Sequence, residues 1–183
     1  MTRDRRSFLI LGGISLVAVA LAACGESASP GVATGTTSAT ESPPGPLDAG
    51  VGETVERDGL KVTVDQVLAT YSFGGFENAP DGTFYVTLEI AIDNGGASTP
   101  DTSFAATRLE LAGGGEGKTD SASAGTNLQQ AGLSPGQSTI GWRTFNVPKG
   151  TKAATLAFTP NPGTEIRIGF VVPSNIQSRM IGV

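Results

Sequence analysis

"FYVTLEIAID", from Phe84 to Asp93, is the stretch that decides the fold of this chain. Apolar side chains occupy every second position, which places on one face Phe84, Val86, Leu88, Ile90 and Ile92. The other face receives mostly polar side chains, among them Tyr85, Thr87, Glu89 and Asp93. Successive side chains of a β-strand point to opposite faces, so this period predicts a strand between a core and water.

The same period recurs on both sides of this stretch. In "LKVTV" the inward residues would be Leu60, Val62 and Val64, and further strands are expected at 107–111, 138–147, 153–158 and 165–172. Turn-forming clusters such as "APDG", "DNGG", "SPGQ" and "NPG" separate them. Short alternating strands without a helical period predict an all-β antiparallel sandwich over residues 51–173, followed by a C-terminal tail at 174–183.

The region before the sandwich has a different composition. Residues 25–50 contain no aromatic residue and no Lys or Arg, and they are rich in Gly, Ser, Thr and Pro. Such a segment buries too little apolar surface to offset the entropy of ordering. We therefore expect a disordered linker over residues 24–50.

Residues 1–23 have the layout of a secretory signal peptide. A basic start with Arg3, Arg5 and Arg6 precedes an apolar run from Phe8 to Ala23. The run is short for a membrane-spanning helix, which needs about 20 apolar residues. We expect export and removal of this segment.

The signal peptide ends in a motif that bears on location. Leu21-Ala22-Ala23-Cys24 resembles the bacterial lipobox, which implies a diacylglyceryl group, with acyl chains such as palmitate, on the Cys24 sulfur and cleavage before it. Two acyl chains anchor a protein stably. The resemblance implies a lipoprotein on the extracytoplasmic face of the bacterial cell membrane. A plain signal peptide with a stray cysteine and an uncleaved anchor are the alternatives.

The basic start also resembles a twin-arginine export motif. "DRRSFLI" supplies Arg5, Arg6, Phe8 and Leu9, and it departs from the usual pattern at Asp4 and Ile10. The alternative is an ordinary basic start for the general secretion route, and the sequence leaves this choice open.

Composition argues against several function classes. A formal net charge of −5 argues against nucleic-acid binding, which relies on clustered Lys and Arg. The chain has no His and one Cys, so a His-based catalytic triad is impossible and zinc or copper lacks its usual ligands. Acidic residues show no spacing typical of a calcium loop. We expect no metal, no cofactor and no enzyme activity.

One glycine-rich stretch imitates a phosphate-binding loop. "AGGGEGKT", from Ala112 to Thr119, ends in Gly-Lys-Thr, but phosphate binding needs a helix directly after the loop. The following "DSASAGTNLQQAG" has no amphipathic helical pattern. We predict a hairpin loop here.

An aromatic loop is the one candidate for partner contact. In "YSFGGFENAP" the residues Tyr71, Phe73 and Phe76 surround two glycines. Such a loop suits partner contact, although large aromatic rings are more often buried, here as a cap on the sandwich edge. Trp142 lies within a predicted strand and is expected in the core.

The order of these features resembles a bacterial family, the telokin-like, immunoglobulin-like domain of unknown function found in exported lipoproteins and akin in fold to secreted immunoprotective antigens. The resemblance covers residues 52–160 and rests on "GLKVTVDQV", "DGTFYVTLEIAIDNGG", "TRLELAGGGEG", "LSPGQSTIGWRTFNVP", "PKG" and "ATLAFTP". It implies a seven- or eight-stranded sandwich with a binding or structural role, and it carries no catalytic residues.

Two functions follow from these features. The favoured one is a membrane-anchored lipoprotein that displays a non-catalytic binding or structural domain to an envelope protein or polymer. The alternative is a small-ligand carrier or an enzyme with a pocket in the sandwich. The partner and the oligomeric state are open at this point.

Overall fold

The computed structural model describes residues 41–74, 77–129 and 131–179. The predicted signal peptide, Cys24 and the linker up to residue 40 lie outside these ranges. The strands are β1 (Thr54–Arg57), β2 (Leu60–Thr70), β3 (Ser72–Phe73), β4 (Glu77–Asn78), β5 (Thr83–Asn94), β6 (Thr107–Leu111), β7 (Glu116–Asp120), β8 (Ser138–Pro148), β9 (Ala153–Asn161) and β10 (Thr164–Val171). A 3₁₀ turn at Phe104–Ala106 precedes β6.

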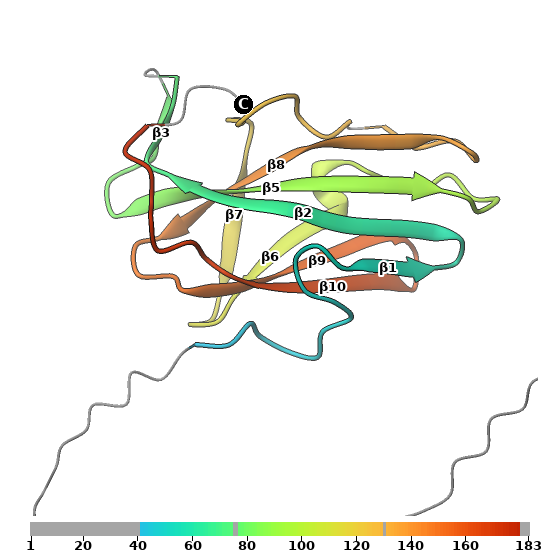
Figure 1. Ribbon diagram of the computed structural model, residues 1–183, viewed down its shortest axis with the longest axis horizontal. Helices are drawn as coiled ribbons and strands as arrows, with labels where there is room; N and C mark the ends of the chain where they lie inside the picture. The colour runs from blue at the N-terminus through green and yellow to red at the C-terminus, as the bar shows by residue number, and fades with distance from the viewer. Residues whose placement is uncertain (1–40, 75–76, 130, 180–183) are drawn as a thin grey trace, which may run out of the picture. The chain divides into compact units, whose positions relative to one another are not determined.

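These strands form a β-sandwich, as predicted (Figure 1). Their hydrogen-bonded order is β1-β2-β5-β8-β7-β6-β9-β10, with antiparallel pairing throughout this order. The chain of strands folds on itself, so that β1-β2-β5-β8 faces β6-β9-β10. Strand β7 pairs with both β8 and β6 and links the two layers. The eight strands agree with the expected number.

The core between the layers confirms the predicted alternation. From the first layer it receives Leu60, Val62, Val64, Phe84, Val86, Leu88, Ile90 and Ile92, all at most 2% exposed. The second layer contributes Leu109, Leu156, Phe158, Ile166 and Ile168, which are equally buried. Burial of large apolar side chains is the dominant stabilising term in folding, and here it fills the space between the sheets.

The other face of β5 corrects one expectation. Tyr85 and Thr87 were expected to face water, yet they are 4% and 0% exposed. They do point away from the main core, but a second apolar cluster covers them, formed with Phe73, Ala122, Ala124 and Trp142. The covering segment is the loop of residues 121–128, called the covering loop from here on. Its small residues carry no apolar periodicity, so strand alternation alone did not reveal it.

This covering loop is held on β8 by a close backbone approach at Gly141. Trp142 N–H donates to the Thr126 carbonyl, and Leu128 N–H donates to the Trp142 carbonyl, both at 2.9 Å. A Cβ on Gly141 would lie 2.6 Å from the Leu128 backbone nitrogen. Glycine is therefore required where the loop crosses the strand.

Besides the two-residue pair β3 and β4, the strands that were not predicted are β1 and β7. Both are short and polar, with the sequences "TVER" and "EGKTD", so neither shows an apolar period. The turn between β1 and β2 does carry a signal. Asp58 and Gly59 both have positive φ (55° and 77°) and link Arg57 to Leu60, which is the Asp-Gly two-residue hairpin turn.

The N-terminal end of the domain corrects the predicted linker boundary. Residues 43–50, called the strap from here on, lie on the outer face and edge of β9 and β10 rather than in a disordered linker. Asp48 N–H donates to the Arg167 carbonyl at 2.8 Å, and Gly169 N–H donates to the Ala49 carbonyl at 3.0 Å. Figure 1 shows this blue segment below β10. Backbone pairing and side-chain hydrogen bonds order it despite its low apolar content.

Candidate functional site

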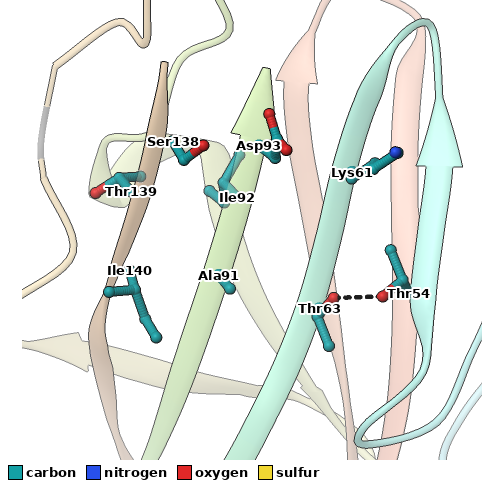
Figure 2. Close-up of a pocket in the computed structure, with 9 residues that line it drawn as sticks. All are labelled: Thr54, Lys61, Thr63, Ala91, Ile92, Asp93, Ser138, Thr139 and Ile140. Carbon is teal, nitrogen blue, oxygen red and sulfur yellow. Dashed lines mark hydrogen bonds between the residues drawn. The ribbon is translucent and has the colours of Figure 1, made fainter. Parts of the chain in front are cut away.

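The outer face of β1-β2-β5-β8 carries an open groove (Figure 2). It is lined by Thr54, Lys61, Thr63, Ala91, Ile92, Asp93, Ser138, Thr139 and Ile140. A neighbouring hollow, lined by Glu89, Thr126 and Trp142 among others, continues from it at Ile140.

Ile140 is the exposed apolar residue of the groove and lies on β8, at one side of it. Ile140 is 57% exposed although it is the third residue of the 11-residue strand β8. The strand registers place it in one cross-strand row with Ala91 on β5, Thr63 on β2 and Thr54 on β1. Thr54 and Thr63 share a hydrogen bond of 2.8 Å between their hydroxyls. The row is therefore shallow, methyl-bearing and held rigid by the sheet.

Charged residues border this row on one side. Lys61 stands opposite Asp93 in the register, and Ser138 stands opposite Asp93 on its other side. Figure 2 shows these three side chains at one end of the groove. Small apolar contacts at the centre with donors and acceptors at the rim are the anatomy of a protein-contact surface. None of the nine lining residues is aromatic.

Sequence reasoning did not single out this groove. The signal was nevertheless present in "STIGWRTFNV", where Ile140 occupies an outward position between Ser138 and Trp142 on the same face. An isolated apolar residue at an outward strand position is common, and only the registers reveal its row.

Of the three aromatic residues predicted for partner contact, the structure describes Tyr71 and Phe73. Phe73 is 5% exposed and packs against Tyr85 with ring centroids 5.3 Å apart. Tyr71 is 37% exposed, lies edge-on to Phe84, and has the Lys149 ammonium 5.4 Å from its ring centroid. Phe76 lies outside the described residues, as do Arg5, Arg6, Phe8, Leu9, Leu21, Ala22, Ala23 and Cys24. Phe73 thus follows the edge-capping alternative.

Arg143 is a buried cation that the sequence did not reveal. Its side chain is completely buried on the core side of β8, donates to the Thr102 carbonyl at 2.7 Å, and lies 4.1 Å from the Phe104 ring centroid. Among the described residues, its Nε and Nη1 have no hydrogen-bond partner. Burial lowers the pKa of this guanidinium to about 10.

The other sequence motifs behave as follows. The phosphate-loop look-alike is a hairpin, as predicted, because its Lys118 and Thr119 lie in β7 and pair with β8. Within residues 41–74, 77–129 and 131–179, no group of three or more Asp, Glu, Cys or His side chains could hold a metal ion. No helix in the described part of the chain is long and apolar enough to cross a membrane.

The order and pairing of the strands are those of an immunoglobulin-like β-sandwich domain. The chain belongs to the family described as "Domain of unknown function (DUF4352)", which it matches over residues 49–168. This confirms the expected membership in a family of such domains whose function is unknown. No curated protein matches the chain.

Solved structures show the same fold. The Bacillus subtilis protein ycdA, described as a candidate lipoprotein, matches with a TM-score of 0.53 and 17% identity over 64% of this chain. The match spans only 38% of ycdA. The yjhA protein of Bacillus subtilis matches with a TM-score of 0.51 and 17% identity over 66% of this chain and 97% of its own. At this identity the similarities establish the fold alone.

Proposed function

We propose that the chain is a lipid-anchored, extracytoplasmic binding module without catalytic activity, and that it presents the groove around Ile140 to a protein partner of the cell envelope. The location is supported by the signal-peptide layout and the lipobox at Cys24. It is also supported by the description of ycdA, which shares the fold, as a candidate lipoprotein. A linker before the domain would hold it clear of the bilayer.

The exposed Ile140 in its rigid row is the observation that carries the binding role. A protein partner is favoured over a glycan because sugar rings stack on exposed aromatic faces, and the nearby Trp142 is only 6% exposed. Core side chains fill the space between the sheets. This favours binding on the outer surface over the alternative of a carrier or an enzyme with a pocket in the sandwich.

Site-specific photo-crosslinking tests this proposal. Benzoylphenylalanine is placed at Ile140 or, as the matched control, at Val171, an aliphatic residue with similar exposure (61%) on another surface. In the cells that make the protein, we expect from position 140 a discrete adduct with another protein that position 171, on β10, does not give. Addition of Thr63→Arg, which fills the groove with a charged side chain, should abolish the adduct.

Two results would contradict the proposal. Equal adducts at both positions, or none at position 140, would remove the groove as the binding site. A heterogeneous adduct that glycan-degrading enzymes collapse, and proteases do not, would assign the groove to an envelope polymer instead of a protein.

A further inference from the structure

The strap is bound to the domain as a peptide ligand is bound to a receptor. Its sequence from Pro43 to Asp48 is "PPGPLD", in which three of the six residues are proline. Proline-rich segments favour an extended conformation whose carbonyl oxygens have no internal partners. Domains that recognise such segments supply donors for these carbonyls and pockets for the side chains between them.

Arg167 supplies most of these donors. Its Nε donates to the Pro46 carbonyl at 3.0 Å, and its Nη2 donates to the Pro44 carbonyl at 3.3 Å. The Thr155 hydroxyl also donates to the Pro44 carbonyl, at 2.9 Å. Arg167 is itself held in place by Glu110, at 2.6 Å, and by Glu165, at 3.0 Å. The donors are therefore positioned by the sheet and not by the strap.

The side chains of the strap have their own seats. A Cβ placed on Gly169 would lie 2.5 Å from Leu47 Cδ1 and 2.9 Å from Pro43 Cβ. Leu47 and Pro43 therefore occupy the space that a side chain at position 169 would fill. Asp48 accepts from the Arg167 backbone N–H at 2.8 Å and from Arg57 Nη2 at 2.7 Å. The site thus selects for prolines, an aliphatic residue and a carboxylate in that order.

The strap is nonetheless separable from the domain. Leu47 remains 44% exposed, and the Arg57–Asp48 pair is open to water, so each contact is weak. Behind the strap lies the exposed turn Val51–Gly52, where Gly52 has a φ of +81°. The family match begins at residue 49, so that the segment from Pro43 to Asp48 precedes the shared domain.

We propose that the outer face of β9 and β10 is a binding site for proline-rich segments, and that two copies of this chain exchange their straps through it. Each copy carries one ligand and one site, so the exchange is reciprocal and closes at a dimer. The occupant is the strap of the second copy, because its prolines, Leu47 and Asp48 match the donors, the seat and the cations already described. The site lies on a different face from the Ile140 groove and does not depend on it.

A complementary pair of cysteine variants tests the exchange. Both are made in the chain from residue 24 on with Cys24→Ser, so that no other thiol competes. In the Gly169→Cys chain, the new side chain collides with Leu47 and displaces its own strap. In the Leu47→Cys chain, the shortened residue leaves room for that side chain. Mixed under oxidising conditions, the two should form a disulfide-linked heterodimer, which a synthetic peptide of residues 41–50 should suppress.

The controls make each outcome decisive. Gly113→Cys, at a glycine with open space around it, replaces Gly169→Cys in the control mixture and should give only background crosslinking. The double variant Leu47→Cys/Gly169→Cys should close an internal disulfide. If the double variant closes but the mixture stays at background, the strap binds only its own domain and the proposal is wrong. If neither forms a disulfide, the site itself is wrong. If Gly169→Cys chains in cells crosslink to a different protein, the site belongs to that partner.

Discussion

Single residues set the electrostatics of this domain, and Arg143 shows how. A completely buried guanidinium without a carboxylate partner is costly, and the domain tolerates it through one carbonyl and one aromatic face. Alternation along β8 places Arg143 on the same face as Phe145 and Val147, but an arginine gives no sign in the sequence that it will be buried there. Its burial depends on the approach of residues 102–104 from a distant loop.

We expect size, rather than charge, to be what Arg143 contributes. Arg143→Ala should lower the free energy of unfolding by about 2–4 kcal/mol because it leaves a cavity and an unpaired Thr102 carbonyl. Arg143→Met should stay within about 1 kcal/mol of the wild type, since it fills the volume without a buried charge. Chemical denaturation measures both. Equal losses in the two variants would instead assign the stability to the guanidinium contacts.

Glu110 should make stability depend on pH. Its hydrogen bonds from Arg167, at 2.6 and 3.1 Å, hold its pKa below the ordinary value of 4.5. A lowered carboxyl pKa stabilises the folded state above the ordinary pKa, and the gain is lost as pH falls through the lowered value. We expect Glu110→Gln to cost about 1 kcal/mol at pH 7 and nothing near pH 2, by denaturation midpoints.

A matched control for Glu110 is available on the same protein. Glu56→Gln removes an exposed pair with Lys61 that spans 4.0 Å, and it should change stability little at either pH. A Glu110→Gln effect that stays constant between pH 7 and pH 2 would show that shape, not charge, is responsible.

At the scale of elements, the sequence predicted what depends on local pattern and missed what depends on distant pairing. Strands β2, β5, β8, β9 and β10 were predictable because buried strands repeat apolar residues. Strands β1 and β7 were not, because both are short and polar and show no apolar period. The strap and the covering loop look disordered by composition, yet specific backbone contacts order both. The Ile140 groove emerges only when four strands align.

The covering loop gives a prediction with an internal probe. Gly141→Ala should force the loop away from β8, because the added Cβ would meet the Leu128 backbone. Trp142 is the chain's one tryptophan and lies beneath this loop. We expect a red shift of tryptophan fluorescence and a loss of about 2 kcal/mol or more. Gly113→Ala has open space around it and should leave the spectrum unchanged.

For the whole molecule, the proposed anchor makes a direct prediction. Cys24→Ser should abolish incorporation of labelled palmitate and move the protein from the membrane fraction to the soluble one, because two acyl chains are lost. Fractionation and metabolic labelling measure this. Gly113→Ala, which keeps Cys24 and has open space around it, serves as the control and should remain at the membrane. Unchanged labelling of Cys24→Ser would refute the lipobox assignment.

The attachment of the strap has a mechanical consequence for the intact protein. Any pull on the N-terminal chain reaches the strap before it reaches β1. It first loads the hydrogen bonds that the Pro44 and Pro46 carbonyls accept from Thr155 and Arg167, and then those of Asp48 and Ala49 with β10. Those bonds would yield before the core strands, and the released residues 43–50 would extend by about 25 Å. Release of the strap would then lengthen the tether under tension while the sandwich stays folded.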